Sequence, residues 1–386
     1  MGVRGPQLAR LGRAAINLTR RRHPLPERER VDAKHVPAGT AAADCGDRAV
    51  KPERLNEITS RYRALRVVLI GDIALDRYLH IDPALAETSI ETGLPVHNVV
   101  AVRPQPGAGG NVLANLAALR PRTLAAVGFS GDDGEGLELH RGLETLGVDL
   151  RHFLGRRDRM TFTYTKPILV RPGRPPEELS RLDIRSRTPT PAELEDALIA
   201  ALRVAATDAD VIVAMDQVPE PQSGVLTRRV KAALGDLAKA RPAKVFIADS
   251  RTSIGDFAGV RIKVNRSELA RHFGAAVEGA DVEALAARWS RELGREVFVT
   301  MGEEGVLAAD GNRVARVPGI PLEPPIDSVG AGDSCLASIA MALAAGATPA
   351  EAAELGNLAG AITSKKIGTT GTATVEELAA MLVRER

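Results

Sequence analysis

From about residue 66 onward, short apolar runs alternate with segments in which apolar residues recur every three or four positions. Continuous apolar runs of this kind are typical of buried parallel strands, and the three-to-four spacing is typical of helices. We predict strands at 66–71, 123–131, 210–216, 244–250, 261–265 and 296–302. We predict helices at 52–65, 112–119, 135–146, 191–206, 224–240 and 282–293. This alternation indicates an α/β fold with a doubly wound, mainly parallel sheet flanked by helices.

Two segments interrupt the alternation. Residues 79–104 and 160–171 are rich in β-branched and turn residues, and no helical pattern separates the strands within either segment. We expect them to form a small antiparallel β lid on the main sheet, spanning about 78–105 and 159–171. A lid that closes over a substrate excludes water from the reacting groups.

The first 52 residues differ from the rest of the chain because they are rich in Arg and small polar residues and are broken by Pro. We predict a disordered or weakly structured basic tail at 1–52 and one α/β domain at 53–386. No uninterrupted apolar stretch follows the basic start, which argues against a secretory signal. An organelle transit peptide remains an alternative.

Composition excludes several classes of function. Hydrophobic residues make up 44% and charged residues 26%, as in ordinary globular domains, and the net charge is only +2. Aromatic residues are 3%, too few for base-stacking platforms, and no apolar run reaches the ~18 residues of a membrane span. The two cysteines, Cys45 and Cys335, form no disulfide framework. We expect a cytoplasmic protein that binds neither nucleic acid nor membrane.

Polar residues follow the predicted strands, at the edge where open α/β sheets bind ligands. Ionised carboxylates there suit a hydroxyl-rich ligand, because they accept hydrogen bonds from several hydroxyls. Taken singly, each residue could equally be a helix N-cap, and only their shared edge favours a binding crevice. The residues are Asp72, Asp76, Asp216, Asp249, Asn265, Thr300 and Gly302.

The strongest local motif is "DSVGAGDS", Asp327 to Ser334, at the start of an apolar helix. Gly330, Ala331 and Gly332 let a ligand approach the backbone, and the free amides of a helix N-terminus favour an anion. Asp333 lies in the same turn. It is either a helix-capping carboxylate or a base that takes a proton from a hydroxyl attacking a phosphoryl group.

Other signatures of nucleotide and hydrolytic enzymes are missing from the sequence. It contains no P-loop, no complete dinucleotide fingerprint, no G-x-S-x-G elbow and no zinc spacing. A second glycine-rich loop, "PGAGGNVLANLAAL", opens the helix that carries Asn111. Alone it could be a packing turn or a ligand loop.

Together these elements resemble the ribokinase-like (PfkB) sugar kinase family over roughly residues 55–380. Asp327–Asp333 matches the family pattern D-T-x-G-A-G-D with Ser328 in place of Thr, and Gly107–Asn111 matches its N-terminal glycine signature. "NRSE" at 265–268 matches its N-x-x-E magnesium pattern, and "TMGEEG" at 300–305 resembles its T-x-G-x-x-G nucleotide segment. The resemblance implies a ribokinase-like fold, with ATP and Mg²⁺ as nucleotide and metal.

The resemblance also implies a role for each matching residue. Asp333 would be the base and the Gly330, Ala331, Gly332 and Asp333 amides the anion hole. The implied sugar ligands are Asp76, Gly109, Gly110 and Asn111. To these we add the strand-end carboxylates Asp72 and Asp216 and the cation Lys166 as expected sugar-binding residues. The implied nucleotide residues are Asn265, Thr300, Gly302, Gly305 and Asn357. Asn265 and Glu268 would hold Mg²⁺ through water, and Asp327, with the backbone near Val329 and Gly368, would hold K⁺. Family lids also pair between subunits, which implies a homodimer.

Within the family, the chain most resembles the kinase domain of bifunctional ADP-heptose synthases, which phosphorylates heptose 7-phosphate at C1. Residues 67–80, 89–96 and 180–184 carry this likeness. Gln105 replaces an Arg of that group, the stretch from Asp216 lacks its Lys, and Arg251 stands where the group has the Lys of D-P-K. Arg251, Lys166 and Arg181 could supply the missing positive charge for a phosphorylated sugar.

We therefore expect an ATP-dependent kinase acting on a hydroxyl of a small-molecule sugar or sugar phosphate. A nucleoside or other small-alcohol kinase is the first alternative, with Phe162 and Tyr164 as stacking candidates. A catalytically silent sugar-binding protein is the second, although it would have no need of Asp333, Asn265 and Glu268.

Overall fold

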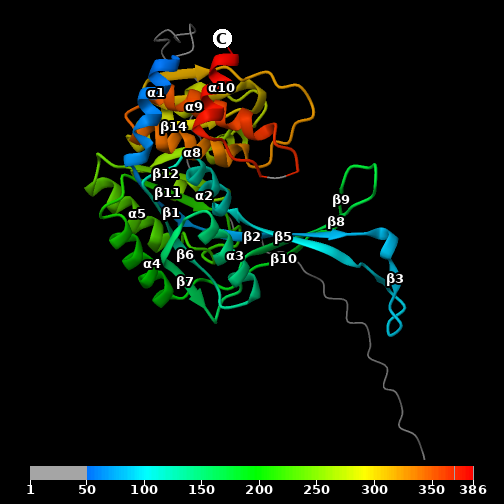
Figure 1. The fold of residues 1–386 in the computed structure, drawn as a ribbon. Helices are drawn as coiled ribbons and strands as arrows, with labels where there is room; N and C mark the ends of the chain where they lie inside the picture. Colours follow the sequence, from blue (N-terminus) through cyan, green and yellow to red (C-terminus); the bar gives the residue numbers. More distant parts are fainter. Residues whose placement is uncertain (1–49, 369, 386) are drawn as a thin grey trace, which may run out of the picture. The chain divides into compact units, whose positions relative to one another are not determined.

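A sheet of nine strands forms the centre of the part of the chain that the computed structural model describes, residues 50–368 and 370–385 (Figure 1). Its strand order is β16-β15-β14-β13-β12-β11-β1-β6-β7, and only the β14–β15 and β15–β16 pairs are antiparallel. The prediction of a mainly parallel sheet is thus confirmed. The strands are β1 (Arg66–Gly71), β6 (Thr123–Gly131), β7 (Asp149–Arg156), β11 (Val211–Asp216), β12 (Val245–Ser250), β13 (Arg261–Asn265), β14 (Val297–Thr300), β15 (Val306–Asp310) and β16 (Arg313–Val317).

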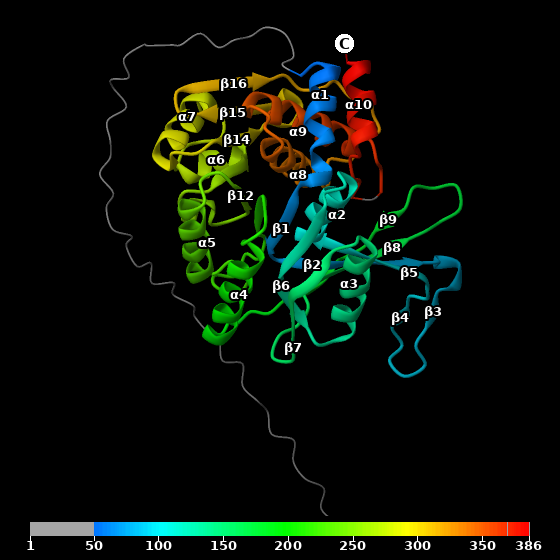
Figure 2. The same cartoon turned by 60° about the vertical axis from the view of Figure 1, so that its left-hand side comes forward.

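Helices cover both faces of this sheet, and each face has its own apolar core (Figure 2). Strand β1 serves both, because Val67 and Leu69 point into one core while Val68 and Ile70 point into the other. The first core is covered by α1 (Pro52–Ser60), α2 (Gly109–Ala118), α3 (Gly134–Thr145), α8 (Ala331–Ala344), α9 (Pro349–Ser364) and α10 (Val375–Arg384). The second is covered by α4 (Ala192–Ala205), α5 (Arg228–Ala240), α6 (Arg266–His272) and α7 (Val282–Leu293).

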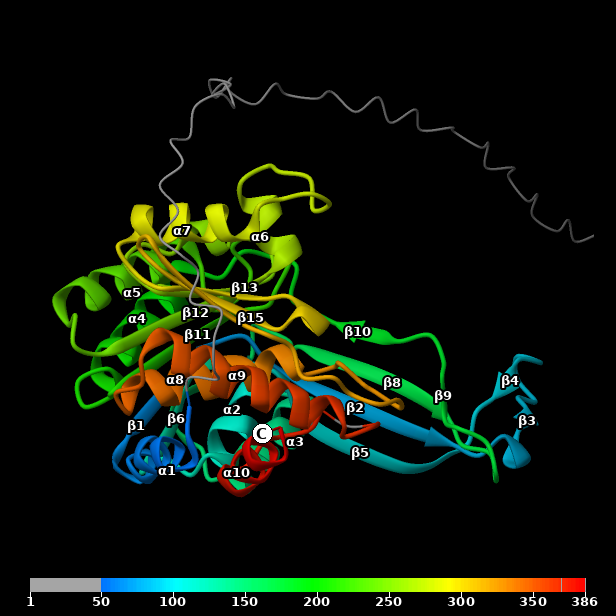
Figure 3. The ribbon, with the colours of Figure 1, turned by 90° about the horizontal axis from the view of Figure 1, so that it is seen from above.

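A second sheet, in the order β10-β8-β2-β5, extends away from the main one (Figure 3). Its β2–β5 and β8–β10 pairs are antiparallel as predicted, but β2 and β8 run parallel. The strands of this lid are β2 (Ile73–Ile81), β5 (Val99–Ala108), β8 (Thr163–Leu169) and β10 (Leu182–Ile184), with the short β3 (Glu87–Thr88), β4 (Pro95–Val96) and β9 (Glu177–Glu178) beside them. Single 3₁₀ turns occupy Tyr62–Ala64, Pro83–Leu85, Ile254–Asp256 and Gly302–Glu304.

The register of the lid gives its two faces opposite character. Asp76 pairs with Gln105 and with Tyr164, and Tyr78 pairs with Arg103 and Lys166, so one face is polar. The opposite face carries apolar side chains at Leu79, Val102, Pro167 and Leu182. Successive side chains of a strand point to opposite faces of the sheet, so the polar set and the apolar set lie on different faces.

Most predicted elements lie where the sequence places them, including β6 and α7, whose observed bounds equal the predicted ones. Helix α5 begins at Arg228 rather than 224, because Thr227 caps it by accepting from the Val230 amide. Strands β7 and β16 have few fully buried positions and were not predicted, because their residues lack a continuous apolar run.

The predicted tail at 1–49 lies outside the described residues. Val50, also assigned to that tail, is fully buried in the first core, and its amide donates to Glu354 Oε2 at 3.0 Å. Among the described helices, none combines the length and the apolar character that a bilayer crossing requires.

Candidate active site

The motif "DSVGAGDS" forms the N-terminus of α8, at the carboxyl edge of the main sheet. Gly330 is the N-cap and has a φ of 83°, a left-handed conformation that favours glycine. Two amides of the predicted anion hole are already used, since Ala331 donates to the Ser328 carbonyl and Asp333 to the Gly330 carbonyl. The amides of Gly330 and Gly332 have no partner among the described residues and are therefore the two that can receive an anion.

Asp333 has the electrostatics of a poised base. Burial raises the pKa of its carboxyl to about 6, and the charge of Asp249 acts in the same direction. The charge of Lys263 and a hydrogen bond from the Asn111 side chain partly oppose this rise in pKa. The predicted sugar ligand Asn111, on α2, thus lies beside the predicted base on α8.

Lys263 is a site residue that sequence reasoning missed. It lies on β13 and is only 6% exposed, and its Nζ is 2.6 Å from Asp249 Oδ2 at the end of β12. Burial alone would lower the pKa of Lys263, but the carboxylate of Asp249 raises it above its usual value. The sequence does contain one indication of this residue, because Lys263 stands between the apolar Ile262 and Val264 within the predicted strand 261–265.

A cavity of about 860 Å³ opens on the other side of the α8 N-terminus. Four predicted nucleotide residues line it, Thr300, Gly302, Gly305 and Asn357, together with Gly332 of the anion hole. The remaining wall is largely apolar and suits a planar base; it includes Val306, Ile320, Pro321, Leu322, Ile326, Cys335 and Ala361. The side-chain amide of Asn357 also donates to the Pro318 carbonyl at 2.9 Å. This bond holds the loop after β16 over the cavity.

Asn265 does not line the cavity but begins α6. Its side chain accepts from the Glu268 amide, and Glu268 in turn accepts from the Asn265 amide, forming a capping box. Burial and the charge of Asp249 raise the pKa of Glu268. A cation near Asp249 and Glu268 would relieve this repulsion, so the residues fit a magnesium ion.

Within the described residues, no three acidic, His or Cys side chains converge to hold a metal ion by themselves. Asp327, the predicted potassium ligand, accepts from the amides of Val329 at 3.0 Å and Gly368 at 3.4 Å, which fixes the loop that would surround such an ion.

The polar face of the lid supplies the sugar side of the crevice. Asp76 is 5% exposed, and its Oδ2 lies 3.2 Å from Lys166 Nζ, which also donates to the Tyr78 hydroxyl at 3.2 Å. A Cβ on Gly107 would lie 2.7 Å from the Asp76 carboxyl carbon, so the glycine makes room for that carboxylate. Gly109 and Gly110 likewise make room for the Asp72 carbonyl and for Pro106 at the start of α2.

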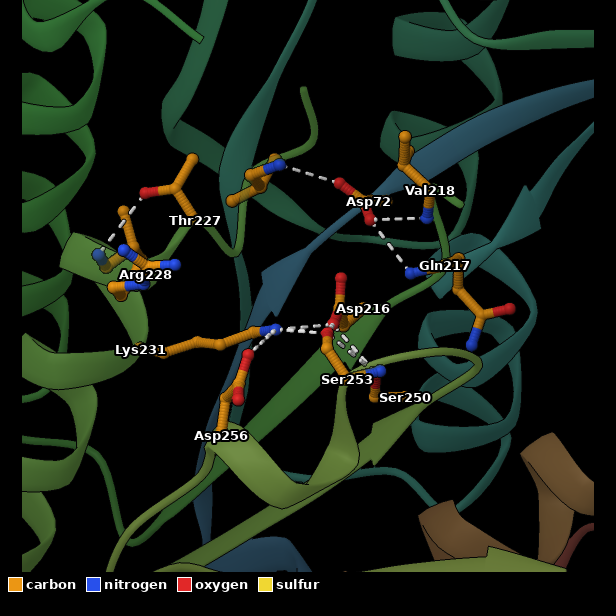
Figure 4. Close-up of polar contacts among 12 residues, drawn as sticks. Asp72, Asp216, Gln217, Val218, Thr227, Arg228, Lys231, Ser250, Ser253 and Asp256 are labelled. Carbon is orange, nitrogen blue, oxygen red and sulfur yellow. Dashed lines mark hydrogen bonds and ion pairs between the residues drawn. The ribbon is translucent and has the colours of Figure 1, made fainter. Parts of the chain in front are cut away.

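Protein groups occupy both carboxylate oxygens of Asp72 but only one of the two oxygens of Asp216 (Figure 4). Asp72 accepts from the amides of Gln217, Val218 and Val225 at 2.7–3.0 Å and is 2% exposed. Asp216 Oδ2 accepts from Lys231, Ser250 and Ser253 at 2.6–2.7 Å. Asp72 therefore holds the loop after β11. Asp216 is the centre of a buried polar network through its Oδ2, while its Oδ1 has no hydrogen-bond partner among the described residues and stays a predicted acceptor for a sugar hydroxyl.

Several arginines border the same crevice. The Arg181 guanidinium lies 4.7 Å from the centre of the Tyr164 ring and pairs with Asp183. Arg251 is exposed, and its charge opposes the rise in pKa that burial causes at Tyr164 and at Asp333, so it lies near both the lid and the predicted base. Among the described carboxylates, none pairs with Arg251, so its charge is free for an anionic ligand.

The two aromatic residues named for a nucleoside differ in exposure. Phe162 is 3% exposed and packs against Phe129 with ring centroids 6.0 Å apart. Tyr164 is partly exposed, and the Arg181 guanidinium lies over one face of its ring. Phe162 is thus excluded as a stacking residue, and Tyr164 stays a candidate.

The lid also contacts the loop beside the anion hole. Gln105 Nε2 donates to Thr370 Oγ1 at 2.8 Å, and Arg103 donates to the Gly368 carbonyl at 3.4 Å. Thr370 packs near Gly330, since a Cβ built there would lie 3.4 Å from Thr370 Cβ.

Comparisons with known proteins agree with this geometry. Residues 261–376 match the family model described as pfkB family carbohydrate kinase. The chain is 35% identical over 322 residues to the bifunctional protein HldE of Azorhizobium caulinodans, covering 82% of this chain and 64% of that relative. The chain thus spans somewhat less than two thirds of the length of this curated relative.

Two solved structures share the fold. Phosphofructokinase-2 from Escherichia coli in complex with potassium superposes with a TM-score of 0.65 at 18% identity, covering 83% of this chain and 99% of that one. Arabidopsis thaliana ribokinase complexed with ribose and ATP gives a TM-score of 0.59 at 17% identity, with the same coverage. Residues 261–376 thus resemble the pfkB family of carbohydrate kinases, and the described part of the chain has the fold of these ribokinase and phosphofructokinase structures.

Proposed function

We propose that the protein is an ATP-dependent sugar kinase that transfers the γ-phosphoryl group of ATP to a hydroxyl of a sugar or sugar phosphate. One observation carries the proposal: Asp333, with a pKa of about 6, stands beside the unpaired amides of Gly330 and Gly332. Those groups suit a reaction in which a hydroxyl loses its proton while negative charge develops on a phosphoryl group.

In the proposed reaction the sugar hydroxyl lies between Asp76 and Asp333, and ATP lies in the cavity lined by Thr300 and Gly305. The hydroxyl oxygen attacks the γ-phosphorus, the bond from that phosphorus to the ADP oxygen breaks, and the hydroxyl proton passes to Asp333. The amides of Gly330 and Gly332 hold the phosphoryl oxygens. Mg²⁺, held near Glu268 and Asn265 through water, would neutralise phosphate charge when bound.

A phosphorylated sugar fits the crevice better than a neutral one. Arg251 has no carboxylate partner among the described residues, and a second cation, Lys166, lies on the polar lid face, where it pairs with Asp76. A phosphate group usually requires such paired cations. Heptose 7-phosphate is therefore our preferred candidate, on the likeness to HldE and on these cations.

We further propose a homodimer through the apolar face of the lid, K⁺ at the Asp327 loop and a cytoplasmic location, where ATP is available. Val102 is 46% and Leu182 61% exposed on that face, although both are apolar. Apolar side chains grouped on one exposed sheet face are typical of an interface.

An ADP-release assay over a panel of sugars tests the function, with each sugar offered free and phosphorylated. We expect release with at least one sugar phosphate, heptose 7-phosphate first, and a 10²- to 10⁴-fold lower kcat for Asp333→Asn, the usual effect of removing a positioned base. Asp236→Asn, the same change at an exposed position on α5 away from the cavity, is the control.

Silence across the whole panel would favour the sugar-binding protein. Turnover of a nucleoside but of no sugar would favour the nucleoside kinase. Release that Asp333→Asn does not reduce would exclude Asp333 as the base.

A further inference from the structure

A buried lysine lies behind the strand-end carboxylate Asp216. Lys231 is near the start of α5 and only 4% exposed, and its side chain extends from the helix to the end of β11 (Figure 4). Its Nζ lies 2.7 Å from Asp216 Oδ2. Burying an ion pair costs free energy that apolar side chains of similar size would not cost. Stability alone therefore does not explain the pair.

The groups around the ammonium all belong to the protein. Lys231 Nζ also donates to Ser253 Oγ, lies 3.9 Å from Asp256 Oδ2 and is 4.9 Å from the centre of the Phe257 ring. These partners surround the three N–H donors of the ammonium, and the side chain has almost no exposed surface. Lys231 can therefore act on a ligand only through Asp216.

The hydrogen bonds to Asp216 all reach one of its two carboxylate oxygens. Oδ2 accepts from Lys231 Nζ, Ser250 Oγ and Ser253 Oγ at 2.6–2.7 Å. Oδ1 has no hydrogen-bond partner among the described residues, yet it is not shut off from solvent. A carboxylate oxygen of this kind accepts a hydrogen bond from water or from a ligand hydroxyl. The three donors thus fix the orientation of the carboxylate and leave Oδ1 as its open acceptor.

Asp216 lies among residues of the crevice. It stands opposite Ser250 in the β11–β12 pair, and its carbonyl accepts from the Arg251 amide at 3.1 Å. On its other side, Asp72 at the end of β1 accepts from the amides of the two residues that follow Asp216. The backbone after Asp216 and its carboxylate are therefore held from different directions, at the sheet edge where we place the sugar.

The same network fixes the turn that carries Arg251. Ser250 Oγ accepts from the Ser253 amide at 3.0 Å, and both hydroxyls donate to Asp216 Oδ2. Arg251 lies within this turn and is the cation that we propose for the sugar phosphate. Through Asp216, Lys231 thus holds both an acceptor for a hydroxyl and the backbone of a cation.

We propose that Lys231 is a positioning residue for the sugar. It orients Asp216 so that Oδ1 accepts a hydrogen bond from a sugar hydroxyl, and it holds the turn with Arg251 in place for the sugar phosphate. This inference rests on the proposed kinase function and deepens it at the sugar site. Residues of other elements line the cavity that we assign to ATP, so the loss of Lys231 should weaken the sugar alone.

The competing explanation is that the pair of Lys231 and Asp216 only stabilises the fold. A double-mutant cycle separates the two roles, because a positioning residue acts through the residue that it positions. We compare Lys231→Met in the wild-type background and in an Asp216→Asn background, with the most rapidly phosphorylated sugar of the panel.

In the wild-type background, we expect Lys231→Met to raise the sugar KM about tenfold, the size of one lost hydrogen bond to a charged group, and the ATP KM less than twofold. In the Asp216→Asn background, the same substitution should raise the sugar KM less than threefold. Equal rises of the sugar KM in both backgrounds would overturn the proposal. An unchanged sugar KM with a lower unfolding temperature would also overturn it, because a purely structural pair predicts that result.

The matched control is Lys244→Met. Lys244 precedes β12 at the opposite edge of the sheet, and its Nζ donates to the carbonyls of Ala206 and Thr207 at 3.1 and 2.7 Å. This substitution should lower the unfolding temperature and leave the sugar KM unchanged. If Lys231→Met does not fold, Lys231→Gln, which keeps a neutral donor, takes its place in the cycle.

Crystal structures of the wild type and of Lys231→Met keep this test separate from the kinase function. We expect the Asp216 carboxylate to turn away from its wild-type orientation in the variant and the turn with Arg251 to shift with it. An unchanged carboxylate and turn would overturn the role of Lys231 even if the enzyme phosphorylates a sugar. If no sugar of the panel is phosphorylated, the proposed function fails, and the sugar role of Lys231 fails with it.

Discussion

At the residue scale, the site depends on a carboxylate whose surroundings change its acidity. Asp333 combines burial and a nearby like charge, which raise its pKa, with Lys263 and Asn111, which limit the rise. A base with a pKa near 6 is ionised at neutral pH and is still able to accept a proton from a hydroxyl. Helix capping alone would not require this environment.

This pKa predicts the pH dependence of turnover. Asp333 must be deprotonated to act, so kcat/KM should fall about tenfold per unit of pH below about 6 and level off above it. A pH series of initial rates between 4.5 and 8 measures this limb, with thermal unfolding at each pH as the control for stability. A flat profile down to pH 5 would contradict the assignment.

The same pKa has the opposite consequence for stability. The pKa of Asp333 is higher in the folded chain than in an unfolded one, so the folded state binds the proton more tightly. Its contribution to stability is present at low pH and is lost as pH rises through about 6. At pH 7, Asp333→Asn should therefore unfold at the same temperature as the wild type or a higher one, while losing activity.

At the element scale, the loop between β11 and α5 is held by one side chain from another strand end. Asp72 accepts hydrogen bonds from three backbone amides of this loop. A Cβ on Gly224 would lie 2.6 Å from the Oδ1 of Asp72. The predicted sugar ligand is thus a structural anchor between β1 and the loop after β11. The loop in turn sets the position of Asp216 at the crevice edge.

We predict that Asp72→Asn lowers the free energy of unfolding by about 2–4 kcal/mol, since it removes hydrogen bonds from a buried charged acceptor. Urea unfolding measures the change. Asp82→Asn is the matched control: Asp82 caps an exposed 3₁₀ turn through the Ala84 amide, and its loss should cost about 1 kcal/mol or less. An unchanged midpoint with a higher sugar KM would instead restore Asp72 as a sugar ligand.

The sequence predicted the elements better than the partners of individual side chains. Continuous apolar runs placed β1, β6, β11 and β13, because buried parallel strands must be apolar on both faces. The strand-end carboxylates were identified, but no pattern could tell Asp76, which faces Lys166, from Asp72, which faces backbone amides. Lys263 was missed because its meaning depends on Asp249 and Gly332, which only the fold brings close.

At the scale of the whole molecule, the proposed homodimer would cover the apolar face of the lid. The polar face of the same sheet belongs to the crevice, so a second subunit on the apolar face would leave the crevice residues Asp76 and Lys166 in place. We expect the wild type to sediment as a dimer.

Val102→Glu with Leu182→Glu should yield a monomer in analytical ultracentrifugation, because two charges would be buried in the interface. Val204→Glu is the matched control, since Val204 is 63% exposed on the distant α4 and should leave the dimer intact. A dimer that survives the lid substitutions, or a monomeric wild type, would contradict the lid interface.

The hydrogen bond from Gln105 to Thr370 has a consequence for how the binding of the two proposed substrates is coupled. It ties the lid strand that faces the sugar to the loop that borders Gly330. A bound sugar that fixes the position of the lid would therefore also fix the turn at Gly330, where we propose that the phosphoryl group binds. Such coupling is reciprocal. If the sugar raises the affinity of the protein for ATP by some factor, ATP raises its affinity for the sugar by the same factor.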